Sequence, residues 1–224
     1  MSVAGSSTLS EFRQRATIAL ADIRVQGGAG GATGKFRDAR TTALATVPDV
    51  AALRDHLKAV RRATISNLAH HLETFERQAT AAGVQVHWAA DSAEASQIVV
   101  DIAQKHGATL AAKSKSMATE EISLNEALLA AGVEPVETDL GEWIIQLSEE
   151  PPYHIIAPAI HKTRGQVAEL FEQISGQAMD ADDIPKLTEA ARHMLRQKFL
   201  EADVGISGTN IARGRNGQHC AGDK

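Results

Sequence analysis

The stretch TLAAKSKSMATEEISLNEALLAAGVEPV, residues 109–136, predicts a strand, a helix and a second strand in succession. Its ends are short apolar runs at 109–113 and 133–136, and Gly132 ends the helical pattern between them. Two strands joined by a helix pair in parallel, because a tight turn cannot carry the chain back to the same end of the sheet. This stretch therefore predicts a parallel pair of strands.

The same alternation continues on both sides of residues 109–136. Upstream, the period-2 pattern at 84–88 predicts a strand, and the spacing of apolar residues at 95–107 predicts a helix. The elements expected downstream are extended runs at 142–147 and 153–160, helices at 167–174 and 187–202, and a last strand at 204–208. Strands that alternate with helices predict an α/β fold, with a mostly parallel sheet and flanking helices.

A helical segment is expected to precede this sheet, over residues 1–82. Apolar residues recur every three or four positions at 9–25 and again at 50–81, and the second run is typical of one long amphipathic helix. Between them lies QGGAGGATG, residues 26–34, whose five glycines predict the end of a helix and a flexible linker. A phosphate-binding loop is the alternative, but Phe36 stands where such a loop has Ser or Thr.

Composition narrows the classes of function. The formal net charge of -5 gives no electrostatic footprint for nucleic acid. The single cysteine, Cys220, cannot form an internal disulfide and cannot by itself hold an iron–sulfur cluster or a structural zinc. The adjacent His70 and His71 point away from one another on a helix, so we expect surface histidines rather than a metal site.

Several diagnostic patterns are missing from the sequence. No apolar run approaches the length that spans a bilayer, and the opening MSVAGSSTLSEFRQR lacks the basic-then-apolar order of a signal peptide. With one cysteine, these features predict a cytoplasmic protein without a membrane span. No Gly-x-Ser-x-Gly, His-Glu-x-x-His or Cys-x-x-Cys motif supports a hydrolase or a metalloenzyme.

Two lysines and two serines, Lys113, Ser114, Lys115 and Ser116, follow the first predicted strand of residues 109–136. In parallel sheets, ligands bind at the carboxyl ends of the strands. Lysines beside the free amides of a helix start make a site for a carboxylate or a phosphate. The loop therefore predicts anion binding.

The residues after this loop also allow a structural explanation. Thr119 suits a helix N-cap, and Glu120 and Glu121 suit the positive end of the helix dipole. That explains the acids but not the lysines. Glu121 and Asn125 are one helical turn apart, so we expect both to reach the same cleft.

Three more polar clusters follow predicted strands. Glu137 and Asp139 could share a proton or set the charge of a lysine, although a solvated loop explains them equally well. His161 and Lys162 follow an apolar run, where the histidine is either a general base or a structural residue. Asn210 closes a glycine-spaced strand exit that lets a ligand approach the backbone.

Four longer runs resemble the lactate utilization protein B family, whose N-terminal portion is a LUD domain. They are VHWAADSAEA (86–95), KSKSMATEEISLNEALLAAGVEPVETDLGEWIIQL (113–147), HIIAPAIHKTR (154–164) and FLEADVGISGTN (199–210). The resemblance covers about residues 50–210. It implies a fold similar to that of the NagB/ribose-5-phosphate isomerase/CoA-transferase group.

The resemblance also implies a function. Members of this family act in the oxidation of L-lactate to pyruvate, in a complex with two other lactate-utilization proteins, and carry two [4Fe–4S] clusters after the LUD domain. A small carboxylate, lactate or pyruvate, is then the expected ligand, with His161, Glu137 and Asp139 as catalytic candidates. The expected substrate-binding residues are Lys113, Ser114, Lys115, Ser116, Glu121, Asn125, Lys162 and Asn210. No residue is expected to bind a metal.

The last residues depart from the family. The run IARGRNGQHCAGDK, residues 211–224, is polar and glycine-rich where the family continues toward a cysteine-rich region. It resembles a truncated or frameshifted end, so we expect this chain alone to hold no cofactor. The expected division is a helical segment at 1–82, a LUD domain core at 83–212 and an aberrant polar tail at 213–224.

Two other functions stay open at this point. One is a non-catalytic interaction module of the lactate-utilization complex, because missing strands would leave a sheet edge that favours association. The other, suggested by fold analogy alone, is a small domain that binds a carboxylate, a phosphate or a CoA-like ligand.

Overall fold

The computed structural model of the chain describes residues 8–213 and 218–220. Its described residues fall in two compact units, one drawn from the ranges 1–33 and 90–208 and the other from 34–89 and 209–224. The first unit holds the parallel sheet. The second holds most of the N-terminal helices.

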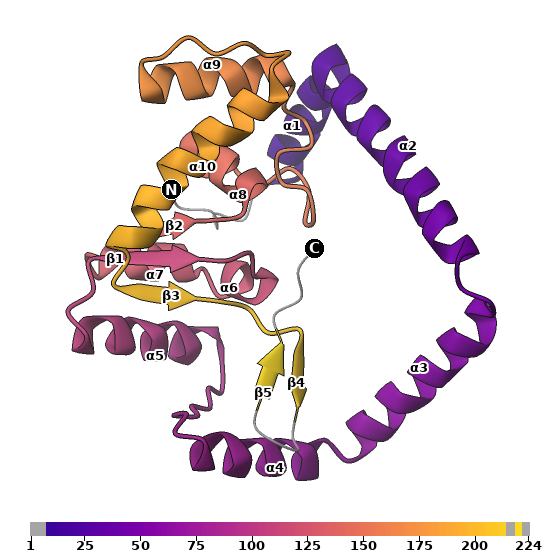
Figure 1. Cartoon of the computed structure of the whole chain (residues 1–224), viewed down its shortest axis with the longest axis vertical. Coiled ribbons are helices and arrows are strands. Elements are labelled where there is room, and N and C mark those ends of the chain that lie inside the picture. Colours follow the sequence, from indigo (N-terminus) through magenta and orange to yellow (C-terminus); the bar gives the residue numbers. More distant parts are fainter. Residues whose placement is uncertain (1–7, 214–217, 221–224) are drawn as a thin grey trace. The chain divides into compact units, whose positions relative to one another are not determined.

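The sheet of the first unit has three parallel strands in the order β2-β1-β3. They are β1 (Leu110–Lys113), β2 (Glu134–Glu137) and β3 (Val204–Ile206), and Figure 1 shows their arrows pointing the same way. The register places Lys113 of β1 opposite Glu137 of β2 and Ile206 of β3. The predicted parallel pair is confirmed, and so is the α/β fold class.

Helices cover both faces of this sheet. One face is covered by α5 (Ser92–Lys105) and α7 (Leu124–Ala130). The other face is covered by α8 (Leu140–Leu147), α9 (Arg164–Ser175) and α10 (Ile184–Glu201). Successive side chains of a strand point to opposite faces, so Ala111 packs with α5 and α7 while Leu110 packs with α8 to α10. The rings of Trp143 and Phe171, whose centroids are 5.6 Å apart, lie in the core between the sheet and α8 to α10.

Asp203 fixes the start of β3 against the start of β1. Its carboxylate accepts hydrogen bonds from the backbone N–H groups of Thr109 at 2.8 Å and Leu110 at 3.1 Å. These two backbone bonds hold the pKa of Asp203 below its usual value. The edge strand is thus tied to the central one by a side chain as well as by the sheet ladder.

Over the described residues 8–82, four helices form the N-terminal segment, as expected, but their boundaries differ from the prediction. They are α1 (Leu9–Ala21), α2 (Ile23–Ala45), α3 (Val50–Ser66) and α4 (Leu68–Ala81). The predicted linker at 26–34 is wrong, because α2 runs through it. Glycine weakens a helix by about 1 kcal/mol relative to alanine but blocks none of its hydrogen bonds, and one glycine is needed here for packing. A Cβ on Gly28 would lie 2.9 Å from the carbonyl oxygen of Ile160.

The single long helix predicted for residues 50–81 is also wrong. Asn67 leaves the helical conformation, with φ -123° and ψ 28°, and separates α3 from α4. Its side-chain amide donates to the carbonyl of Ala63, which satisfies an end of α3. An asparagine that bonds to nearby backbone competes with helix continuation, a preference that the apolar spacing does not show.

Three predicted extended runs do not form strands. Residues 84–88 pair with no described strand, and the indole of Trp88 instead donates to Glu76 on α4 at 3.1 Å. Residues 142–147 belong to α8, because a short apolar run fits a buried helix as well as a buried strand. Residues 153–160 form a loop, in which the His154 ring accepts from the amides of Ile156 and Ala157.

The remaining elements are short. They are α6 (Met117–Glu121) and an antiparallel hairpin of β4 (Ile211–Arg213) and β5 (Gln218–Cys220). Of the expected polar tail, 214–217 and 221–224 lie outside the described residues, and the predicted division into segments stays a prediction. Within the described part of the chain, no helix combines the length and apolar character that a membrane crossing requires.

The glycine-rich part of α2 gives a paired prediction. Gly30→Ala should stabilise the protein by up to about 1 kcal/mol, because alanine favours the helix and nothing lies within 4 Å of the added Cβ. Gly28→Ala should lower the free energy of unfolding, because its Cβ meets the Ile160 carbonyl. Urea denaturation followed by circular dichroism measures both. Equal effects of the two substitutions would contradict the packing of α2 described above.

Candidate functional site

Three predicted site residues meet at the carboxyl ends of β1 and β2. The ammonium of Lys113 lies 2.6 Å from Oε1 of Glu137 and 2.5 Å from Oδ1 of Asn125. The amide of Asn125, on α7, donates to the same Glu137 oxygen at 2.8 Å. We call Lys113, Glu137 and Asn125 the buried triad. The Lys113 side chain is 1% exposed, so its charge is matched inside the protein.

The buried triad is held from the other face by α8. Gln146 accepts from the backbone N–H of Glu137 at 3.0 Å, and its own amide donates to the carbonyl of Pro135 at 2.8 Å. Because both bonds go to β2, they fix α8 against the strand that carries Glu137. The N-terminal turn of α8 is thereby placed beside the carboxyl edge of the sheet.

A second buried ion pair lies next to the triad. The ammonium of Lys115 lies 2.5 Å from Oε1 of Glu142, and their side chains are 6% and 7% exposed. Glu142 stands in the first turn of α8, where Asp139 is the N-cap and accepts from the amides of Gly141 and Glu142. Oε2 of Glu142 is buried and has no hydrogen-bond partner among the described residues.

The environment of Glu142 favours its neutral form. Burial raises the pKa of Glu142, the hydrogen bond and charge of Lys115 partly oppose that shift, and the negative charges of Glu137 and Asp139 add to it. Glu142 belongs to the acidic run 137–142 that the sequence marks as a polar cluster, although the catalytic candidates chosen from that run were Glu137 and Asp139. The available signal was its place three residues after an N-cap aspartate.

The two serines of the loop serve different purposes. Ser114 lines a cavity of about 450 Å³ beside β3, together with Thr138 and Ser207 at the ends of the neighbouring strands. Ser116 is the N-cap of α6 and accepts from the amide of Thr119, so the prediction that Thr119 is the cap is wrong. Close contact with Ser116 also explains a glycine: a Cβ on Gly208 would lie 2.9 Å from the Ser116 hydroxyl.

His161 and Lys162 share one carboxylate. Nε2 of His161 lies 2.9 Å from Glu150, and the ammonium of Lys162 lies 2.5 Å from the other oxygen of that group. Burial raises the pKa of Glu150, but the hydrogen bonds from Lys162 and His161 outweigh it, so the pKa is lowered. Tyr153 stacks on the His161 ring, with centroids 4.9 Å apart. Nδ1 of His161 is buried without a partner among the described residues.

The loop that carries His161 packs beside the start of α8. A Cβ on Gly141 would lie 3.3 Å from Cγ of Pro158, and the Pro158 carbonyl accepts from the amide of Tyr153. The His161 cluster and the acidic cluster at 137–142 are therefore neighbouring parts of one unit, linked through Pro158 and Gly141.

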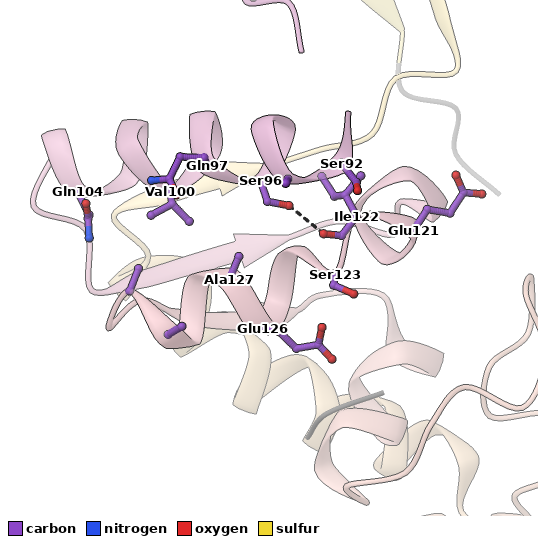
Figure 2. A pocket seen from close by; sticks show the side chains of 13 residues that line it. Ser92, Ser96, Gln97, Val100, Gln104, Glu121, Ile122, Ser123, Glu126 and Ala127 are labelled. Carbon is purple, nitrogen blue, oxygen red and sulfur yellow. Dashed lines mark hydrogen bonds between the residues drawn. The ribbon is translucent and has the colours of Figure 1, made fainter. Parts of the chain in front are cut away.

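One predicted site residue of the first unit, Glu121, does not join the triad. Glu121 ends α6, while Asn125 belongs to α7, because Ser123 between them adopts a left-handed conformation with φ 52°. The expected shared helix face is therefore wrong. Glu121 instead lines a groove of about 660 Å³ between α5 and α7, where Ser96 donates to the carbonyl of Ile122 (Figure 2). Asn210 belongs to the second unit.

Among the described residues, no three His, Cys, Asp or Glu side chains are grouped to hold a metal ion. A [4Fe–4S] cluster takes four thiolates or close equivalents, and this sequence supplies one cysteine. The residues present do not fit such a cluster, so no chemistry is assigned to one within this chain.

Comparison with known proteins identifies the family. The LUD domain matches residues 72–221, which include every element of the parallel sheet and both ion pairs. The chain belongs to the LUD domain family.

Relatives within that family carry a more specific name. The chain is 41% identical to lactate utilization protein B of Oceanobacillus iheyensis, over 83% of this chain and 39% of the relative. It is 37% identical to lactate utilization protein B of an Exiguobacterium species, over 92% of this chain and 44% of the relative. The protein of that name from Bacillus thuringiensis is 35% identical over 94% of this chain and 44% of its own length. The chain thus spans about two fifths of these relatives, and no solved structure matches it.

The buried triad gives a stability prediction. Lys113→Met should lower the free energy of unfolding by about 3–5 kcal/mol, because it leaves the Glu137 carboxylate buried without its counter-charge. Adding Glu137→Gln should recover most of the loss, since the amide keeps an acceptor for Asn125 and carries no charge. Urea denaturation of both variants measures this. A double variant no more stable than the single one would show that charge pairing is not the cause.

Proposed function

We propose that this chain contributes a LUD domain to lactate utilization and binds a small carboxylate, lactate or pyruvate, at Lys115. The supporting observation is the buried ammonium of Lys115 at the carboxyl edge of a parallel sheet, where Glu142 is its single acceptor among the described residues. A role in lactate utilization is supported by membership of the LUD family and by relatives named lactate utilization protein B.

The residues around Lys115 divide into two groups in this proposal. The buried triad holds the edge of the sheet and does not touch the ligand, because the Lys113 ammonium already has two acceptors. Lys115 binds the carboxylate of the ligand by a charge-assisted hydrogen bond. Ser114, the preceding residue, lines the cavity beside β3.

Proton transfer would fall to the neighbouring groups. Oxidation of L-lactate to pyruvate releases two protons and two electrons, and His161 is the proposed general base, with Glu150 fixing its Nε2. Glu137 and Asp139 would act through their charge on Glu142. The electrons would leave to an iron–sulfur protein outside this sequence, and the proposed partners are the other two lactate-utilization proteins. The single cysteine suits the cytoplasm as the compartment.

Removing the Lys115 charge without leaving its partner charged tests the binding site. The double variant Lys115→Met, Glu142→Gln should bind pyruvate and lactate at least about tenfold more weakly than the unaltered chain, because a hydrogen bond to a charged group contributes about 1.5–3 kcal/mol. Isothermal titration calorimetry at neutral pH measures the affinities, and circular dichroism confirms that the variant is folded.

The matched control is the exposed pair of Lys198 and Glu134, 2.9 Å apart. The double variant Lys198→Met, Glu134→Gln removes the same two charges elsewhere in the first unit and should bind both carboxylates unchanged. Equal affinity of the Lys115 double variant and the unaltered chain would refute the proposed site.

A specific observation favours an interaction module as the second candidate function. Leu53, Leu57 and Val60 form an apolar row on α3, spaced by four and three residues, and each is 43% to 51% exposed. A row of this spacing is the seam by which helices pair with a partner. Such a module would bind the other lactate-utilization proteins without turnover.

A substitution in this apolar row of α3 distinguishes an interaction module from a domain that binds a carboxylate. Leu57→Asp should abolish co-purification with the other two lactate-utilization proteins, because a charge in the seam is not matched in the interface. Ala59→Asp, also exposed on α3 but outside the row, is the control. Co-purification that survives Leu57→Asp would argue against a partner on this helix face.

A further inference from the structure

Each carboxylate around Lys115 already has a partner before any ligand arrives. Glu137 is matched by Lys113, and Glu142 by Lys115. Asp139 accepts from the amides of Gly141 and Glu142 at the start of α8. Within this cluster, no positive charge is left over for an additional anion.

A bound carboxylate would add a negative charge that no free cation of the cluster matches. It would place a second negative charge at the buried Lys115 ammonium, next to Glu142 and close to Glu137 and Asp139. Like charges in a buried site resist ionising together, and one of the carboxyl groups then takes a proton.

Glu142 is the carboxyl group best suited to take that proton. Oε1 of Glu137 already accepts two hydrogen bonds, and Asp139 accepts two backbone amides. Glu150, bound by Lys162 and His161, has a lowered pKa and stays ionised. Glu142 alone in this group has a buried oxygen without a partner, and its pKa is raised by burial.

We propose that a carboxylate ligand replaces Glu142 at the Lys115 ammonium and that Glu142 takes up one proton from solvent in the same step. The contact between Lys115 and Oε1 of Glu142 breaks, the contact between Lys115 and the ligand forms, and an O–H bond forms on Glu142. The net charge of the site is the same before and after binding. This inference rests on the proposed function, because it requires a carboxylate to bind at Lys115.

The charged groups that act on Glu142 set the direction of the pH dependence. Lys115 favours its ionised form, whereas Glu137 and Asp139 favour its neutral form. Since the ligand-bound state holds one more proton than the free state, affinity should rise as the pH falls, by up to about tenfold per pH unit. Pyruvate is a suitable probe because its own carboxylate stays ionised over the neutral range.

Calorimetry in buffers with different heats of ionisation counts the proton. Pyruvate titrated into the full chain at pH 7, in PIPES and in imidazole, should show uptake of about one proton for each carboxylate bound. Glu142→Gln should bind pyruvate with no proton uptake and with an affinity that does not change with pH. Glu134→Gln, the control, should keep the uptake of the unaltered chain.

The outcomes separate this inference from the proposed function. If the unaltered chain binds neither pyruvate nor lactate, both proposals are overturned. If it binds them without taking up a proton, the proposed function stands and the coupling to Glu142 is refuted. Proton uptake that persists in Glu142→Gln would likewise overturn the assignment to Glu142.

Discussion

Burial of the Lys113 ammonium beside the Glu137 carboxylate is the constraint on which the carboxyl edge of the sheet depends. Either charge alone in this interior would cost several kcal/mol, so the two strands and α7 are compatible only with the arrangement in which Lys113, Glu137 and Asn125 meet. Gln146 extends that constraint to α8 through its bonds to β2. The positions of Lys115 and Glu142 then follow, since each lies a few residues beyond an element that the triad fixes.

Two lysines separated by one serine have different surroundings for a simple geometric reason. Lys113 is the last residue of β1, and its ammonium meets the amide of Asn125 on α7 and the carboxylate of Glu137 at the end of β2. Lys115 lies beyond the strand and reaches the first turn of α8, where it meets a single carboxylate. The first lysine has the satisfied surroundings of a structural group. The second has a partner with an unused oxygen, the kind of unmet hydrogen bond that in buried sites calls for an explanation.

The sequence predicted the parts of the fold whose signals are local. The strand, helix and strand of residues 109–136 follow from apolar runs and a glycine stop, and α5, α9 and α10 from helical spacing. What it missed depended on contacts between distant residues. The helix through the glycine-rich stretch is compatible with packing of Gly28 against Ile160, more than a hundred residues away. The run at 142–147 fits strand and helix equally, and the bonds of Gln146 to β2 decide for the helix.

In the candidate site, too, the sequence indicated what depends on local signals and missed what depends on contacts between distant residues. Positions at or just after the end of a strand brought Lys113, Glu137, Lys115 and Asp139 to one edge of the sheet, as the topology of parallel sheets requires. Sequence could not reveal which lysine pairs with which acid, because the pairing depends on side-chain direction across two strands and two helices. It also could not foresee the left-handed Ser123 that separates Glu121 from Asn125.

The strands of this sheet are only three or four residues long, so few backbone bonds distinguish the observed alignment from one shifted by a single position. A shift of β1 by one residue would turn the Lys113 side chain to the opposite face, among Trp143 and Phe171, and would leave Glu137 facing an alanine or a serine. A misaligned sheet would therefore bury both charges without partners, whereas a sheet edge made only of apolar residues would tolerate the misalignment. The triad thereby selects the observed register in a sheet whose backbone hydrogen bonds are too few to select it alone.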